Sequence, residues 1–143
     1  MNATLDKFRW PETKIAELEH WAVMLRPEQP TLGALVLVCK QPARSFAEVD
    51  AAGFAELRHA IGGIETMLSR AIGYEKINYL MLMMVDPDVH YHVLPRYEGT
   101  KTLDGISIAD GGWPGPPVLG GSRALTDAEI DRLARTLAAD WPS

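Results

Sequence analysis

The feature that most constrains the fold is an unbroken apolar run over residues 32–39, Leu-Gly-Ala-Leu-Val-Leu-Val-Cys. A strand with one face in water alternates apolar and polar side chains, so this run indicates a central strand that is covered on both faces. A second apolar run lies at Trp21–Leu25, and the segment between the two, Arg26–Thr31, is polar and contains two prolines. The sequence therefore predicts two paired strands joined by a loop longer than a two-residue turn.

A long amphipathic helix is predicted after these strands. Its apolar residues recur at intervals of three and four and so share one helical face. They are Phe54, Leu57, Ile61, Ile64, Leu68 and Ile72. Asp50 precedes the helix as a good N-cap, and Gly73 follows it where a left-handed residue commonly ends a helix. The pair Gly62-Gly63 lowers the helix propensity, and we expect it to permit close packing against the sheet.

Shorter patterns predict the remaining elements. They are a helix over Glu12–Glu19, a strand over Ile77–Val85, a strand over Val89–Leu94 whose ladder pairing ends at Pro95, an irregular glycine- and proline-rich arm over Glu98–Arg123, and a helix from Thr126 with a capping box to Glu129. No repeat or low-complexity linker divides the sequence. We therefore expect one α+β domain over residues 1–143 with a mainly antiparallel sheet.

The composition argues against several classes of function. Fourteen basic and 19 acidic residues give a formal net charge of −5, which argues against a protein that binds nucleic acid or acidic membranes. The apolar runs are far shorter than the ~20 residues of a membrane helix. The first ten residues lack the apolar core of a signal peptide. The single cysteine, Cys39, allows no intrachain disulfide and is typical of a reducing compartment, so we expect a cytoplasmic protein.

The candidate functional residues lie in the segment 88–96, Asp-Val-His-Tyr-His-Val-Leu-Pro-Arg. Because side chains alternate along a strand, Asp88, His90 and His92 project to one side and the apolar residues between them project to the other. A neutral imidazole is a competent nucleophile near pH 7, and a second imidazole can donate a proton to a leaving group. The same pattern is also compatible with an exposed polar strand face.

This segment resembles the signature of the histidine triad (HIT) superfamily, in which three histidines alternate with apolar residues and are often followed by Pro-Arg. The resemblance covers about residues 15–97, because the strand pair, the long helix and an apolar strand precede the signature in the family's order. It implies a HIT-like fold with a mainly antiparallel sheet and a long amphipathic helix. The arm and the last helix, residues 98–143, form a C-terminal extension outside it.

The resemblance also implies a reaction. His90 matches the middle histidine, which in the family attacks the α-phosphorus of a nucleoside phosphate derivative and forms a nucleotidyl-histidine intermediate. His92 matches the third histidine, which assists departure of the leaving group. The resemblance therefore implies a nucleotide hydrolase or nucleotidyl transferase that acts on a nucleotide-derived small molecule, needs no cofactor and pairs as a homodimer. It specifies neither the base nor the leaving group.

The sequence departs from the family pattern at the first triad position, where Asp88 replaces a histidine that helps to orient the nucleophile. We expect the Asp88 carboxylate to take this orienting role. The short segment before the signature also offers few hydrogen-bond donors to a phosphate. Arg96, whose guanidinium can reach a phosphate, and Asn78 are the candidate substrate-binding residues.

Two alternatives to an enzyme of this type remain open from the sequence. Asp88, His90 and His92 form the two-histidine, one-carboxylate set of a metal-binding protein. The missing first histidine and the short preceding loop are also typical of a module that binds a nucleotide without turning it over.

Overall fold

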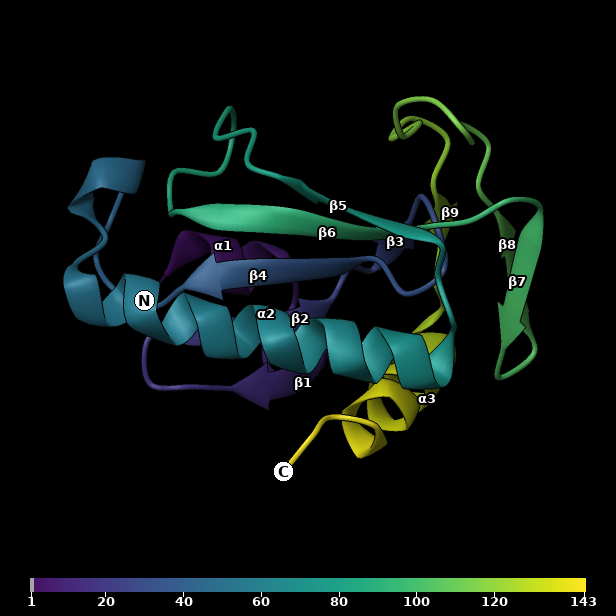
Figure 1. Ribbon diagram of the computed structural model, residues 1–143, viewed down its shortest axis with the longest axis horizontal. Coiled ribbons are helices and arrows are strands. Elements are labelled where there is room, and N and C mark those ends of the chain that lie inside the picture. The colour runs from purple at the N-terminus through teal and green to yellow at the C-terminus, as the bar shows by residue number, and fades with distance from the viewer. Residues whose placement is uncertain (1) are drawn as a thin grey trace.

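Residues 2–143 are described by a computed structural model of the chain, which contains a five-stranded sheet (Figure 1). In spatial order its strands are β1 (Lys14–Glu17), β2 (Trp21–Leu25), β4 (Leu35–Cys39), β6 (His90–Arg96) and β5 (Lys76–Leu80). Every pairing in this sheet is antiparallel. The predicted α+β class and the mainly antiparallel sheet are confirmed.

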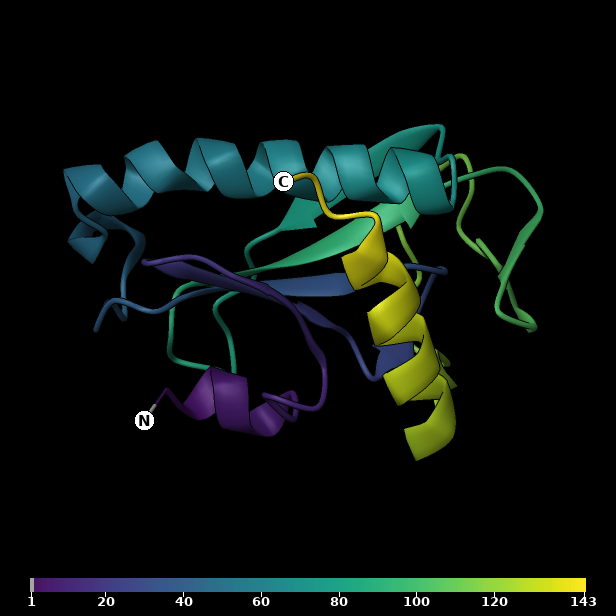
Figure 2. The ribbon, with the colours of Figure 1, turned by 90° about the horizontal axis from the view of Figure 1, so that it is seen from below.

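Helices cover both faces of the sheet, as the apolar run at residues 32–39 requires. The long helix α2 (Ala51–Ala71) lies over one face and the short helix α1 (Ala3–Lys7) over the other (Figure 2). All residues of β4 are fully buried. The odd-numbered side chains of β4 join the core beneath α2, and the even-numbered ones pack with Leu5 and Phe8 on the α1 side. The central strand therefore separates two apolar layers.

The N-terminal segment differs from the prediction. The helix expected over Glu12–Glu19 is absent, because β1 occupies Lys14–Glu17 and pairs with β2. The helix α1 lies earlier in the chain, and the Asn2 side chain caps it by accepting hydrogen bonds from the backbone N–H groups of Thr4 and Leu5. A strand of four residues is too short for its alternating burial to be distinguished from a helical pattern.

The two strands around the predicted histidine signature have different limits from those expected. β5 ends at Leu80, five residues before the predicted Val85, and the chain crosses to β6 without strand pairing. β6 continues through Pro95 to Arg96, so the prediction that Pro95 ends the ladder is wrong. The proline is tolerated because the pairing of β4 with β6 ends opposite Val93, leaving only β5 beside it.

The arm predicted to be irregular contains ordered strands. β7 (Thr100–Leu103) and β8 (Ile106–Ala109) form a hairpin, and β9 (Arg123–Ala124) pairs with β3 (Glu28–Gln29). The hairpin turns at Asp104-Gly105, where both residues have positive φ angles of 52° and 75°. Asp-Gly is the residue pair that a tight hairpin turn favours, so the sequence contained a signal for this element.

Both longer helices begin as predicted. Asp50 accepts a hydrogen bond from the N–H of Gly53 at 2.9 Å at the start of α2, after a 3-10 turn at Phe46–Glu48. The helix α3 (Asp127–Ala139) has the capping box between Thr126 and Glu129, and it packs against β1, β2 and α2. No helix within residues 2–143 is long and apolar enough to cross a membrane. The predicted division of the domain into a core at about residues 15–97 and a C-terminal extension at residues 98–143 stays a prediction.

One glycine of the pair in α2 packs against the C-terminal segment, and neither packs against the sheet. A Cβ atom at Gly63 would lie 2.3 Å from the ring of Trp141, which follows α3 in the chain. A Cβ atom at Gly62 would meet no atom within 4 Å. Gly63 therefore permits the approach of Trp141, and Gly62 has no such packing role.

We predict that Gly62→Ala raises the free energy of unfolding by up to about 1 kcal/mol, because alanine has the higher helix propensity. Gly63→Ala gains the same propensity but displaces the Trp141 ring, so we expect it to be at least about 1 kcal/mol less stable than Gly62→Ala. Chemical denaturation measures both values. In a Trp141→Ala background, Gly63→Ala should become stabilising. Equal stabilities of the two alanine variants in the wild-type background would contradict the contact.

Candidate active site

His90 and His92 lie on the face of the sheet that α1 covers. β6 pairs with β4 so that His90 is opposite Val38 and His92 is opposite Val36, both of which face α1. The exposed fractions of the two histidines are 2% and 8%. Their ring centroids are 5.1 Å apart and their planes are nearly perpendicular. The structure therefore brings the two histidines together in a buried position, and not on an exposed strand face.

The ring of His90 is held by the backbone of its own strand. Its Nδ1 atom lies 2.6 Å from the carbonyl oxygen of Asp88. A carbonyl oxygen only accepts hydrogen bonds, so Nδ1 must carry the proton in this contact. In the neutral ring, Nε2 then has a free lone pair. This tautomer leaves Nε2 available as a nucleophile.

The carboxylate of Asp88 is turned away from His90 and binds α1. Its Oδ2 atom accepts hydrogen bonds from both the backbone N–H and the hydroxyl of Thr4, each at 3.1 Å. The expectation that the carboxylate orients His90 is therefore wrong, because the carbonyl group of the same residue makes that bond. With its carboxylate engaged by Thr4, Asp88 also does not join His90 and His92 as a metal-ligand set.

The described residues do contain another group of possible metal ligands. Glu19, His20 and Glu56 have ligand atoms within 4.8 Å of one another. One carboxylate oxygen of Glu56 already accepts a hydrogen bond from the backbone N–H of His20 at 2.6 Å. These residues do not line the cavity that contains the histidine pair.

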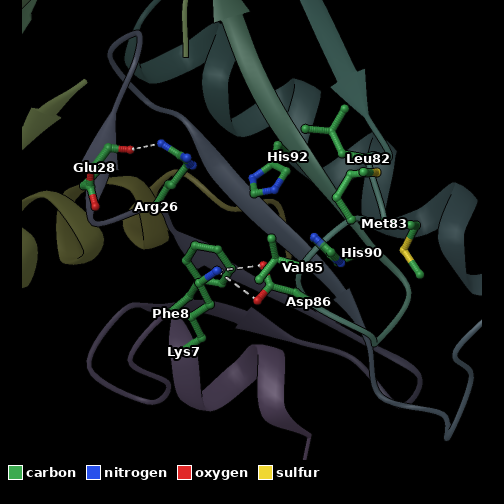
Figure 3. A pocket seen from close by; sticks show the side chains of 11 residues that line it. Lys7, Phe8, Arg26, Glu28, Leu82, Met83, Val85, Asp86, His90 and His92 are labelled. Atoms are coloured by element: carbon green, nitrogen blue, oxygen red, sulfur yellow. Dashed lines mark hydrogen bonds and ion pairs between the residues drawn. The ribbon is translucent and has the colours of Figure 1, made fainter. Parts of the chain in front are cut away.

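The histidine pair lines a cavity of about 260 Å³ between α1 and the segment that joins β5 to β6 (Figure 3). Lys7 and Phe8 form one wall, and residues 82–86 form another. The two walls are joined by an ion pair between Lys7 and Asp86, with an N···O distance of 2.9 Å. Phe8 packs edge-on against the His92 ring, with the ring centroids 5.9 Å apart. A small ligand in this cavity would contact both imidazoles.

His92 is held in its neutral form. Burial lowers its pKa to about 4, and the positive charge of Arg26 acts in the same direction. Its Nδ1 atom is buried without a hydrogen-bond partner. An unpartnered buried acceptor is more common than an unpartnered buried donor, which favours the tautomer with its proton on Nε2. Neutral His92 then offers an N–H donor while neutral His90 offers a lone pair.

The structure places Arg96 and Asn78 outside this cavity. Arg96 forms a buried two-pronged ion pair with Asp110, with N···O distances of 2.7 and 3.1 Å. Its remaining hydrogen bonds go to the side chain of Asn78 and the carbonyl of Gly115. Arg96 therefore ties the arm to the sheet, and the geometry gives no support to the two residues as substrate contacts.

The ion pair of Arg96 also sets the charge of its partner. Burial disfavours the charged form of Asp110, but hydrogen bonds from Arg96 and from the backbone N–H of Tyr97 hold the pKa of the carboxyl below its usual value. Asp110 is thus the counterion that keeps a buried arginine at this position.

Most residues that line the cavity were not predicted as site residues from the sequence, among them Lys7, Phe8 and Arg26. Lys7 and Phe8 reach the site only because α1 folds under the sheet, and the predicted helix lay elsewhere. Arg26 was assigned to a polar loop. One signal in the sequence could have placed Arg26 on the histidine face. Arg26 follows Met24 by two residues, and residues two apart on a strand share a face.

Comparisons with known proteins identify the fold. No family model matches this chain, and no curated protein matches it either. A solved histidine triad protein from Sinorhizobium meliloti 1021 has a TM-score of 0.74 and 23% identity, covering 98% of this chain and 95% of that one. A histidine triad protein from Bradyrhizobium japonicum has a TM-score of 0.74 and 21% identity, covering 99% and 97% of the two chains.

A more distant structure matches in the same way. A hypothetical histidine triad nucleotide-binding protein from Sulfolobus tokodaii strain 7 has a TM-score of 0.69 and 17% identity, covering 90% of this chain and 82% of that one. The chain therefore has the histidine triad fold. The resemblance first seen over residues 15–97 is confirmed for the fold, and the structural match extends beyond these residues to nearly the whole chain.

The lowered pKa of His92 predicts how stability depends on pH. The folded-state value of about 4 lies below the unfolded value of 6.5. Between these pH values the unfolded chain binds the extra proton, so stability falls as the pH drops from 6.5 to 4, by at most about 1.4 kcal/mol per pH unit. Urea denaturation at several pH values in this range should show that the free energy of unfolding depends less steeply on pH for His92→Gln than for the wild type. His59→Gln, on an exposed part of α2, is the matched control. An identical pH dependence of the free energy of unfolding in His92→Gln and the wild type would contradict the lowered pKa of His92.

Proposed function

We propose that this protein is a member of the histidine triad superfamily that binds a nucleotide-derived small molecule in the cavity beneath α1 and cleaves or transfers it at the α-phosphate. The observation that carries this proposal is the 2.6 Å contact between His90 Nδ1 and the Asp88 carbonyl. It holds the ring in place and leaves Nε2 unprotonated beside His92, in a cavity. The fold shared with histidine triad proteins supports the same conclusion.

In the proposed reaction, His90 Nε2 forms a bond to the α-phosphorus while the bond from phosphorus to the leaving group breaks. A bound anionic phosphate favours the protonated form of His92, and this ring gives its Nε2 proton to the leaving group, so that the resulting neutral ring is the proton acceptor for the second step. Water or another acceptor then loses a proton to His92 and displaces the nucleotide from His90. The Nδ1–H of His90 stays bonded to the Asp88 carbonyl, which stabilises the positive charge of the phosphorylated ring.

The second candidate function is nucleotide binding without turnover. Met84 and Val85 are 85% and 82% exposed at the rim of the cavity, and their side chains offer no hydrogen bond to a phosphate. A site with few donors stabilises developing phosphoryl charge poorly. The enzyme should form a covalent nucleotidyl-histidine intermediate, whereas the binding module should form none. The expected homodimer and the cytoplasmic location both stay predictions.

We predict a nucleotidyl adduct on His90 when the protein reacts with nucleoside 5′-phosphoramidates or dinucleoside polyphosphates. Intact-protein mass spectrometry after acid-free quenching detects its mass, and peptide mapping locates it. His90→Ala should lose both the adduct and turnover, because the nucleophile is gone. His92→Gln should retain the adduct but turn over about 10²- to 10⁴-fold more slowly, because the proton donor is lost.

His59→Ala is the matched control, since His59 is an exposed histidine on α2 and should behave as the wild type. Full activity in His90→Ala would overturn the assignment of the nucleophile. Tight nucleotide binding by the wild type with neither adduct nor turnover would instead establish the binding module.

A further inference from the structure

Arg26 reaches the histidine face of the sheet from the end of β2. Its backbone N–H donates to the carbonyl of Ala34 at 3.0 Å, so the pairing of β2 with β4 extends one residue beyond Leu25. Arg26 therefore has the same parity as Met24 and points to the face that α1 covers. The residue across from it is Ala34, whose small side chain leaves room for the guanidinium above the sheet.

Arg26 is a cationic side chain of this cavity that forms no ion pair, although the charge of Glu28 favours its charged form. One nitrogen, Nη1, donates to the carbonyl of Glu28 at 2.7 Å, while Nε is buried without a partner. Arg26 forms no ion pair within the described range 2–143, whereas Lys7 is paired with Asp86 and Arg9 with Asp127. A guanidinium stays charged at any physiological pH, so a half-buried one with no ion-pair partner is suited to an anionic ligand.

The guanidinium lies at the junction of two cavities. The cavity that contains the histidines, about 260 Å³, and a second cavity of about 230 Å³ share Lys7, Phe8, Arg26 and Glu28 as lining residues. The histidines line only the first of the two. A ligand bound at the histidines therefore shares its cavity with Arg26, which also borders the second cavity.

The strand register separates Arg26 from the proposed nucleophile. His90, His92 and the Ala34–Arg26 pair lie in successive rows on one face of the sheet, each row two residues from the next. At about 3.4 Å per residue, the row of Arg26 is roughly 14 Å from that of His90. Figure 3 shows the same order, with His92 between His90 and Arg26. An anion held by Arg26 therefore lies on the far side of His92 from the site of attack.

We propose that Arg26 forms a subsite for a second phosphate of the substrate, separate from the phosphate attacked by His90. This inference rests on the function proposed above and narrows its substrate class to nucleotide derivatives with at least two phosphate groups. The second phosphate belongs either to the ribose or to the leaving group, and both sources present the same oxygen atoms to the guanidinium.

The test compares substrates that differ by one phosphate. Three compounds are used: a nucleoside 5′-phosphoramidate, the same compound with a 3′-phosphate on the ribose, and a nucleoside 5′-diphosphate derivative whose leaving group carries the extra phosphate. For the wild type, kcat/KM should be about 10- to 100-fold higher for one of the two doubly charged compounds than for the first. In Arg26→Gln this preference should fall to about one, because the guanidinium that contacts the second phosphate is gone.

Arg58→Gln, an exposed arginine on α2, is the matched control and should keep the preference. A cooperative thermal unfolding transition of Arg26→Gln is required to establish that the variant is folded. An equal loss for all three compounds would overturn the proposal, because Arg26 would then act on the attacked phosphate. An unchanged preference in Arg26→Gln, or no preference in the wild type, would also overturn it.

A binding measurement separates this inference from the proposed reaction. Calorimetry with a nucleoside monophosphate and its 3′,5′-bisphosphate and diphosphate counterparts needs no turnover. A preference for a second phosphate that Arg26→Gln removes supports the subsite even if the wild type shows no catalysis. Equal affinities of the wild type for all three nucleotides would refute the subsite and leave the role of His90 intact.

Discussion

Asp88 connects the parts of the site because its side chain and its backbone bind different elements. The carboxylate accepts two hydrogen bonds from Thr4 and holds α1 over the sheet, while the carbonyl accepts from His90 and fixes the ring. With α1 in place, Phe8 packs on His92 and Lys7 reaches Asp86, which joins the two walls of the cavity. The burial that keeps His92 neutral depends on this cover.

The fold is predictable where burial imposes a long pattern. The 21 residues of α2 carry an apolar stripe and a capping aspartate, and β4 is apolar because two layers cover it. The pattern of apolar residues does not predict short elements whose stability depends on pairing with another strand. β1 has four residues and is stabilised by its pairing with β2, and the β7–β8 hairpin has an Asp-Gly turn inside a segment dominated by glycine and proline.

The site is predictable only as far as a single strand determines it. Alternation along β6 places His90 and His92 on one face, which the register with β4 also requires. The role of Asp88 depends on Thr4, which is 84 residues away in the sequence, so no local pattern contains it. Arg96 had the right chemistry for a phosphate, but folding supplies Asp110 as its counterion. Arg26 forms no ion pair within residues 2–143, and that difference is visible only in three dimensions.

The central claim is that the backbone of Asp88 holds His90 with its proton on Nδ1 and a free Nε2. Nitrogen-15 NMR of the labelled imidazole measures this tautomer directly, with His90→Ala identifying the resonances. We expect the neutral ring to show a protonated Nδ1 and an unprotonated Nε2, because the carbonyl oxygen only accepts a hydrogen bond. A neutral His90 that carries its proton mainly on Nε2 would contradict the account, because the nucleophilic atom would then have no free lone pair.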